Sequence, residues 1–138
     1  MKTTEIIQRD LKTMLSRFKE ALLKPKDMDS RDLVIKRFEI VYELAWKLLR
    51  RVMMEAGIDV AVSPKQIFRQ AYRAELISDP KVWFDFQKDR NYVVHLYLEA
   101  AAENVYKKAK VFVAAVNEVL ENVERELRED KVNGELGE

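Results

Sequence analysis

Hydrophobic residues recur every three or four positions along most of this chain, a spacing that places them on one face of an α-helix. The first stripe ends near Lys24, because Pro25 disfavours helical geometry in the residue before it. A second stripe begins after Asp29, which we expect to cap its first turn together with Asp32, and it ends at Gly57. The members of the two stripes are Ile7, Leu11, Met14, Phe18 and Ala21, then Val34, Phe38, Val41, Ala45, Leu48 and Val52. They predict two long amphipathic helices.

Two prolines mark the starts of shorter helices in the middle of the chain. Ser63 and Pro64 precede the first, with Gln66 placed to complete a capping box, and Asp79 with Pro80 precede the second. A last helix has the most regular spacing and resembles a coiled-coil seam. Its hydrophobic positions are Ala102, Val105, Ala109, Phe112, Val116, Val119 and Val123. Three long stripes and two short helices predict an all-α fold, a four-to-five-helix up-and-down bundle with antiparallel neighbours.

The length of 138 residues is enough for one domain to bury a hydrophobic core without a metal or a disulfide. We expect a single bundle over residues 1–130 and a disordered tail over residues 131–138, which contain two glycines. No stretch approaches the roughly 20 apolar residues of a membrane span, and the start of the chain lacks an apolar signal core. Because cysteine is also absent, we expect a cytoplasmic protein.

The net charge of +1 comes from 25 basic and 24 acidic residues. The chain as a whole therefore has no field that attracts nucleic acid, and contact with RNA would need a local basic patch. The absence of cysteine excludes thiol chemistry, and one histidine alone cannot form a multi-histidine metal site. Glycine-rich phosphate loops are absent too. We therefore expect neither a metal nor a cofactor.

The remaining candidate for chemistry is the segment 89–97, which holds the only histidine beside an arginine, an asparagine and two tyrosines. On an unbroken helix, Arg90 and His95 would project about 140° apart and would not share a face. Asn91 and His95 would share one, as would Arg90 and Tyr97. Arg90 and His95 therefore converge only if the helix breaks between them or if a second subunit supplies one of the pair. The adjacent β-branched Val93 and Val94 are compatible with a break.

An arginine paired with a histidine suits phosphodiester chemistry. A histidine that titrates near neutral pH can move a proton to or from a ribose hydroxyl, and a guanidinium can hold the phosphate and stabilise the charge that develops on it. The alternative is structural: Arg90 and His95 cap a helix end or pair with nearby carboxylates. The carboxylates in reach along the sequence are Asp85, Asp89 and Glu99.

Residues 90–97 read R-N-Y-V-V-H-L-Y, which resembles the R-x4-H-x-Y signature of HEPN-domain proteins. Three further groups of residues resemble the branch of that family named for nucleotidyltransferase substrate-binding proteins. They are Arg37-Phe38-Glu39 with residues 42–47, Ser63-Pro64 with residues 67–71, and Trp83 ahead of Asp89-Arg90-Asn91. The resemblance covers nearly the whole chain except the tail, and it implies a HEPN-like helical bundle.

The resemblance also implies a homodimer in which the R-x4-H segments of two subunits meet at one cleft. Members of the family that this chain resembles are typically encoded beside a minimal nucleotidyltransferase. In toxin–antitoxin pairs the HEPN protein is a metal-independent ribonuclease. Carried over to this chain, Arg90 would hold the scissile phosphate, His95 would act as general acid or base, and Asn91 would orient substrate or histidine. The transferase would neutralise the toxin by adding AMP to Tyr97, whose new charge and bulk would oppose RNA entry.

Two other groups of charges are candidates for substrate or partner contact. Lys65, Arg69 and Arg73 recur every fourth residue and form a basic ridge that can contact phosphates, unless it is an ordinary solvated face. Glu43 and Lys47 lie on a charged stripe beside Tyr42 and Trp46 in the segment of family resemblance. This stripe is either an exposed face with a Glu43–Lys47 pair or a contact surface for the transferase or a nucleotide.

Three functions follow from these observations. The first is a HEPN ribonuclease, the toxin half of a two-component system, whose enzymatic activity the sequence leaves open. The second is a non-catalytic subunit that presents a substrate or nucleotide to the transferase, which the near-zero net charge favours. The third is a helical homodimer used only for assembly. RNA, a nucleotide, a nucleotidyltransferase and a second copy of the chain are the partners considered, and a membrane is not.

Overall fold

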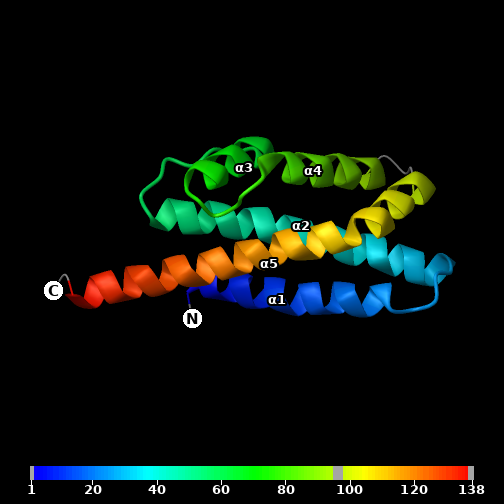
Figure 1. Ribbon diagram of the computed structural model, residues 1–138, viewed down its shortest axis with the longest axis horizontal. Coiled ribbons are helices and arrows are strands. Elements are labelled where there is room, and N and C mark those ends of the chain that lie inside the picture. Colours follow the sequence, from blue (N-terminus) through cyan, green and yellow to red (C-terminus); the bar gives the residue numbers. More distant parts are fainter. Residues whose placement is uncertain (1, 95–97, 137–138) are drawn as a thin grey trace.

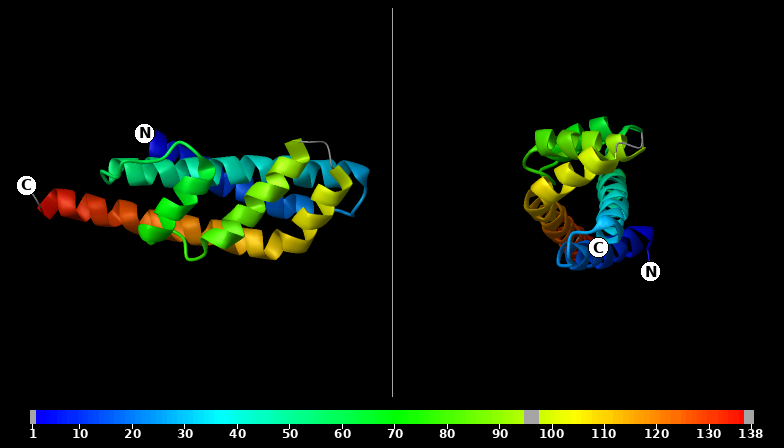
Figure 2. Two further views of the ribbon diagram at one scale, coloured as in Figure 1. Left: turned by 90° about the horizontal axis from the view of Figure 1, so that it is seen from above. Right: turned by 90° about the vertical axis from the view of Figure 1, so that its right-hand side faces the viewer.

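A computed structural model describes residues 2–94 and 98–136, and all the regular structure in these ranges is helical. The helices are α1 (Thr3–Leu22), α2 (Met28–Glu55), α3 (Pro64–Arg73), α4 (Pro80–Val94) and α5 (Leu98–Leu136). The chain reverses direction from α1 to α2, from α2 to α3 and α4, and again to α5, while α3 and α4 together cover one side (Figures 1 and 2). The predicted all-α up-and-down bundle is confirmed, with five helices in the described ranges.

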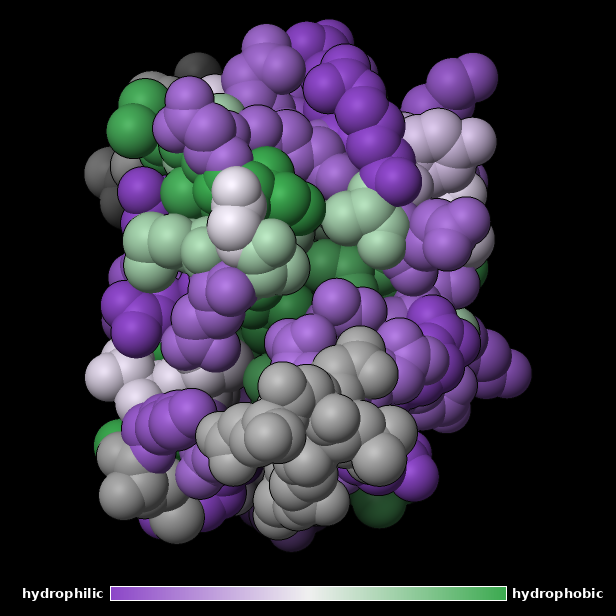
Figure 3. Space-filling view, turned by 90° about the vertical axis from the view of Figure 1, so that its left-hand side faces the viewer, coloured by the Kyte–Doolittle hydropathy of each residue, from purple (hydrophilic) through white to green (hydrophobic). Residues whose placement is uncertain are grey.

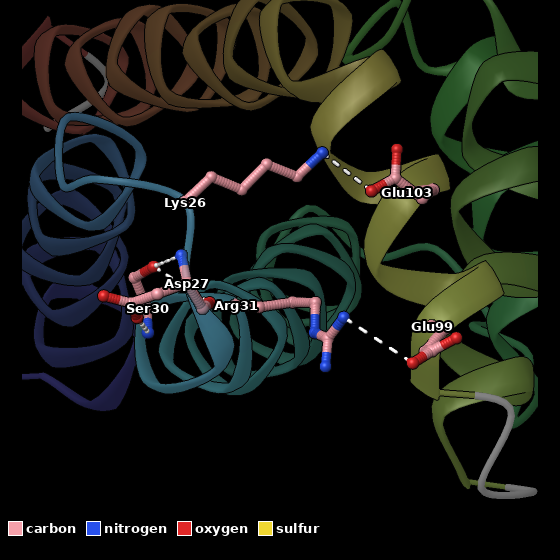
Figure 4. Close-up of polar contacts among 6 residues, drawn as sticks. All are labelled: Lys26, Asp27, Ser30, Arg31, Glu99 and Glu103. Carbon is pink, nitrogen blue, oxygen red and sulfur yellow. Dashed lines mark hydrogen bonds and ion pairs between the residues drawn. The ribbon is translucent and has the colours of Figure 1, made fainter.

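The predicted cap at the start of α2 is wrong by two residues. The cap is Asp27 and not Asp29: the Oδ1 atom of Asp27 accepts a hydrogen bond from the Ser30 amide, and the Ser30 Oγ atom accepts one from the Asp27 amide, both at 2.9 Å (Figure 4). Asp27 has the extended backbone that a cap requires, whereas Asp29 already lies in the first turn. In the first turn the negative charge of Asp29 interacts favourably with the positive end of the helix dipole, but its side chain does not cap the helix.

The other ends follow the predicted signals more closely. α2 ends at Glu55, and Gly57 adopts a left-handed backbone with φ of 88°, which explains why a glycine terminates this helix. α3 begins at Pro64 after Ser63, but the Ser63 side chain makes no capping hydrogen bond, so the capping box predicted there is wrong. α4 begins at Pro80, and Asp79 Oδ1 accepts a hydrogen bond from the Lys81 amide at 2.9 Å.

The hydrophobic stripes meet in one main core. Every predicted position in α2 and α5 is buried; in α1, Ile7 and Met14 are only partly buried, and Leu15 takes the inner position. The ring of Phe112 on α5 lies at the centre, with its centroid 4.7 Å from that of Phe38 and 4.9 Å from that of Phe86. The long helices therefore converge on one aromatic cluster that joins α1, α2, α4 and α5.

The C-terminal ends of α2 and α5 lie at the same end of the bundle (Figure 1). α5 is described as far as Leu136, and the end of the domain near residue 130 stays a prediction. Figure 3 shows this end of the molecule, with hydrophobic residues gathered on one side among hydrophilic ones. The loop after α2 contributes an 85% exposed hydrophobic residue, Val62. None of the described helices is both long and apolar enough to cross a membrane.

Candidate functional site

The candidate segment lies where α4 gives way to α5. Arg90 and Asn91 are on the last turns of α4, which ends at Val94, and α5 begins at Leu98 and runs back along the bundle (Figures 1 and 2). The residues on either side of positions 95–97 therefore belong to different helices, while the predicted convergence of Arg90 and His95 stays a prediction. His95 and Tyr97 themselves lie outside the described residues.

Arg90 lies where α4 packs against α2. Its Nε atom is 3.4 Å from Oε1 of Glu43, and the side chains of Arg90 and Glu43 are 37% and 30% exposed. The other oxygen of Glu43, Oε2, accepts a hydrogen bond from the indole Nε1 of Trp46 at 3.0 Å and lies 3.9 Å from Lys47 Nζ. The structure thus brings together three candidate residues from two distant segments, Arg90, Glu43 and Lys47, around one carboxylate.

Tyr42 is a buried neighbour of this cluster that the sequence placed only within a family signature. Its hydroxyl is buried and has no hydrogen-bond partner among the described residues. Burial raises the pKa of Tyr42 well above its usual value; the negative charge of Glu43 raises it further, and the positive charge of Arg90 opposes both. Like any tyrosine, Tyr42 is protonated at neutral pH, and its hydroxyl is a donor beside the Glu43–Arg90 pair without a partner among the described residues.

Another residue of α4, Asp89, is tied to α5. This carboxylate is buried, and its Oδ2 atom lies 3.1 Å from the ammonium of Lys108. Burial raises the pKa of Asp89, while hydrogen bonds from Lys108 and Asn104 and the charge of Lys108 oppose the rise. From the sequence, Asp89 was expected only as a carboxylate near Arg90. Its partner Lys108 on the next helix was not predicted, because no local pattern indicates it. The pair fixes the α4–α5 hairpin on which Arg90 is carried.

Two ion pairs hold the start of α5 against the α1–α2 turn. Lys26 Nζ lies 2.7 Å from Glu103 Oε1, and Arg31 reaches toward Glu99 with 4.0 Å between Nη1 and Oε1 (Figure 4). Lys26 also lies over the ring of Tyr106, 4.6 Å from its centroid. The hydrogen bond from Lys26, helped by its charge, lowers the pKa of Glu103. These contacts join the first turns of α5 to the α1–α2 loop and to the first turn of α2.

A small second hydrophobic cluster packs directly beside the segment. It consists of four buried residues from three helices: Ile35, Val93, Ala101 and Ala102. Val93 is near the end of α4, and the two alanines are near the start of α5. Small alanine side chains let helices approach closely. The cluster, the Asp89–Lys108 pair and the two ion pairs at α5 therefore anchor both sides of the candidate segment to the rest of the bundle.

Two residues of the predicted basic ridge on α3 share a neighbour on α4. Lys65 and Arg69 lie over the ring of Phe84 on α4, 5.4 and 5.5 Å from its centroid. Arg73 instead lines a separate shallow depression together with Arg125 of α5. Asn91 is exposed and follows Phe84 by two helical turns, so the two residues share one face of α4. Lys65 and Arg69 of α3 cover Phe84 on this same face. Within the described part of the chain, no three histidine, cysteine, aspartate or glutamate residues are placed to bind a metal.

Residues 7–125 match the family described as nucleotidyltransferase substrate binding protein like. This chain belongs to that family. The matched range contains every candidate residue named above, including His95 and Tyr97. The resemblance to this branch of the HEPN proteins is therefore confirmed.

Relatives of this chain agree with it in sequence and in fold. It is 32% identical over 93 residues to the Haemophilus influenzae protein called "Probable ribonuclease HepT", and the match spans 64% of each chain, slightly under two thirds of that relative. A solved structure from Thermus thermophilus is similar with a TM-score of 0.73 and 28% identity, covering 82% of this chain and 98% of that one. A Haemophilus influenzae structure is said to reveal the fold of a substrate binding domain of a nucleotidyltransferase. It is similar with a TM-score of 0.63 and 27% identity, and the match covers 88% of this chain and 96% of that one.

Proposed function

We propose that this protein is the HEPN partner of a minimal nucleotidyltransferase encoded nearby and that it is a metal-independent ribonuclease toxin. The proposed site combines Arg90, Asn91 and His95 of the R-x4-H-x-Y motif at the cleft of a homodimer. Nucleotidylation of Tyr97 by the transferase neutralises it. The family match and a relative called a ribonuclease support the proposal.

Cleavage without a metal needs a proton carrier and a cation at the phosphate. The ribose 2′-hydroxyl oxygen attacks the adjacent phosphorus and loses its proton, and the bond to the 5′-oxygen breaks as that oxygen takes up a proton. His95 is the residue suited to move these protons, because an imidazole titrates near neutral pH. Arg90 is suited to bind the non-bridging phosphate oxygens and stabilise their developing charge, and Asn91 to orient substrate or histidine.

The single observation that carries this proposal is the state of the Arg90 guanidinium. It is partly exposed, lies on the last turns of α4, and contacts Glu43 through one nitrogen at 3.4 Å. A guanidinium can offer two parallel hydrogen bonds to a carboxylate or a phosphate, and the 3.4 Å contact with Glu43 is longer than a strong charge-assisted hydrogen bond. A phosphate can therefore bind Arg90 without first breaking a strong bidentate pair.

The test is incubation of purified protein with total RNA in EDTA, comparing wild type with Arg90→Ala and His95→Ala. Lys88→Ala is the matched control, because it also removes one positive charge from α4 and its side chain is exposed. We expect wild type and Lys88→Ala to cleave and both motif variants to lose cleavage by roughly a hundredfold or more, the loss typical of removing an acid–base or charge-stabilising group. Folded wild-type protein that leaves RNA intact overturns the ribonuclease proposal.

A second candidate is a non-catalytic subunit that presents a substrate or nucleotide to the transferase. The observation in its favour is the pairing of Arg90 with Glu43 in a chain whose net charge is only +1, since both reduce the attraction for RNA. This candidate predicts no cleavage by the isolated protein, together with a change in the transferase's activity when the two proteins are mixed. The same preparation and the same variants therefore distinguish the two functions.

A further inference from the structure

A groove lies beside Trp46, between α1, α2 and the loop before α3. Its volume is about 350 Å³, within the range of roughly 300–1,000 Å³ typical of small-molecule sites. The residues that line it are Ile7, Trp46, Lys47, Arg50, Arg51 and Val62. Three of the six are cations and the other three are apolar, with no carboxylate among them.

The cations in the groove have defined neighbours, and two of the three lie near a carboxylate. Arg50 donates from Nε to the carbonyl oxygen of Ala61 at 3.1 Å, which fixes the guanidinium and leaves its terminal nitrogens for other contacts. The Nη2 atom of Arg51 is 3.9 Å from Glu55, and its buried Nε has no hydrogen-bond partner among the described residues. Lys47 is exposed, and its Nζ lies 3.9 Å from Glu43, a carboxylate that also contacts Arg90. An anion entering the groove therefore competes with Glu43 for Lys47 and with Glu55 for Arg51, whereas the contact of Arg50 is with a neutral carbonyl.

The aromatic wall of the groove is held in place as well. The Trp46 indole donates to Glu43 at 3.0 Å, so its ring orientation is fixed, while the ring remains partly exposed. An indole face stacks on any nucleobase, and apolar residues such as Ile7 and Val62 can cover the remaining faces of a planar group. A flat ring and three cations in one groove match a ligand that joins a heterocycle to a phosphate chain.

The geometry points to a binding site for a free nucleoside phosphate in this groove. The base stacks on Trp46, and Lys47, Arg50 and Arg51 hold the phosphates. Arg90 does not line the groove, so nucleotide binding and RNA cleavage can be present or absent independently. Glu43 is the neighbour common to both, because it contacts Arg90, Trp46 and Lys47.

The binding test is titration calorimetry of the full-length protein in EDTA with ATP, adenosine or inorganic tripolyphosphate. We expect saturable ATP binding, with adenosine and tripolyphosphate each much weaker because each offers only part of the contacts. Trp46→Ala should weaken ATP about tenfold, the usual scale for losing a stacked base, without changing tripolyphosphate binding. Lys47→Ala should weaken both ATP and tripolyphosphate. The matched control is Lys110→Ala, which removes an exposed lysine of α5 outside the groove and should bind ATP as wild type does.

Tryptophan fluorescence gives a second readout that does not require Trp46→Ala to fold. The chain has two tryptophans, and Trp83 is only 1% exposed. ATP should quench wild-type emission and leave the emission of Trp46→Phe unchanged. Arg90→Ala should bind ATP like wild type, even if it loses RNA cleavage, which separates this site from the proposed ribonuclease site. Absence of ATP binding, equal binding of tripolyphosphate and ATP, or equal losses in Lys110→Ala and Lys47→Ala would overturn the proposal.

Discussion

Glu43 is the residue that organises the described part of the candidate site. Its two carboxylate oxygens contact Arg90, Trp46 and Lys47, and its charge contributes to the raised pKa of Tyr42. The sequence predicted the Glu43–Lys47 pair, because residues four apart on a helix are neighbours. Nothing local indicated the Arg90 contact, because that contact depends on how α4 packs against α2. Glu43 therefore competes with any phosphate for the Arg90 guanidinium.

Replacing Glu43→Gln should strengthen the binding of RNA to this protein. The amide oxygen of glutamine can still accept the Trp46 hydrogen bond, while the negative charge beside Arg90 is gone. Since a partly exposed ion pair contributes roughly 0.2–1 kcal/mol, the gain should be at most a few-fold in Kd and should shrink as salt is raised. Fluorescence anisotropy with labelled RNA measures it.

Glu39→Gln is the control for this experiment. It removes a carboxylate one turn earlier on α2, where Glu39 lies 3.9 Å from Lys36. An equal gain in both variants would mean that general charge, and not the release of Arg90, governs the attraction for RNA. An unchanged Kd in Glu43→Gln would mean that Arg90 does not contact the RNA.

At the scale of helices, periodicity was sufficient where one face of a helix meets the core. All predicted positions of α2 and α5 are buried, because these helices present one stripe to a single core. In α1 the inner face includes Leu15 and the buried polar Gln8, which donates to Glu124 of α5, so the hydrophobic pattern alone placed the stripe slightly off centre. The Asp29 cap failed for a similar local reason: Asp27, two residues earlier, has the extended backbone and the Ser30 partner.

Contacts between distant helices could not be predicted from local patterns. The Asp89–Lys108 and Lys26–Glu103 pairs join residues far apart in sequence, and a single chain without an alignment contains no local signal for them. Helix geometry did predict that Arg90 and His95 converge only if the helix breaks between them or a second subunit supplies one of the pair. In the structure α4 ends at Val94 and α5 begins at Leu98, while the position of His95 relative to Arg90 stays a prediction.

Asp89→Asn tests whether the buried, ionised carboxylate of Asp89 lowers the stability of the α4–α5 hairpin. Burial raises the folded-state pKa of Asp89, so the folded chain holds this proton more tightly than the unfolded chain does. The stability from this group is therefore present at low pH and lost as pH rises through the raised pKa. Asparagine has no such proton, so the variant's free energy of unfolding relative to wild type should be higher at neutral pH than at acid pH.

Urea unfolding at the two pH values measures this difference. Asp32→Asn is the control, because Asp32 is an exposed carboxylate on α2. A pH-independent difference for Asp89→Asn, or a higher relative stability of the variant at acid pH, would show that the Lys108 contact outweighs the cost of burial at Asp89.

Phe112→Ala tests the convergence of the helices on one aromatic cluster. Phe112 of α5 contacts rings on α1, α2 and α4, so its removal leaves a cavity that no single helix can fill. We expect a loss of about 3–5 kcal/mol in the free energy of unfolding, against under about 0.5 kcal/mol for Val111→Ala, whose side chain is 52% exposed on the same helix. A loss below about 1 kcal/mol at Phe112 would contradict the central position of this ring.

At the scale of the whole molecule, the near-zero net charge leaves recognition to local surfaces. Arg90 lies at one such surface, the cationic groove beside Trp46 is a second, and the side of α3 where Lys65 and Arg69 cover Phe84 is a third. None of them attracts RNA strongly over long distances, so a ribonuclease of this kind would depend on assembly to concentrate its cations. A homodimer brings two copies of each surface together.

The central claim is that Arg90 of one subunit and His95 of the other form a ribonuclease site at a dimer cleft. The most direct measurement mixes Arg90→Ala with His95→Ala, allows the subunits to exchange, and assays RNA cleavage in EDTA, with light scattering to establish the dimer. If the dimer cleft contains two symmetric sites, each with Arg90 from one subunit and His95 from the other, every mixed dimer regains one of the two sites. Since about half of the dimers are mixed, cleavage should return to about a quarter of wild type, although each variant alone is inactive. A mixture as inactive as its components, from folded and exchanging dimers of an active wild type, would show that the site lies within one subunit.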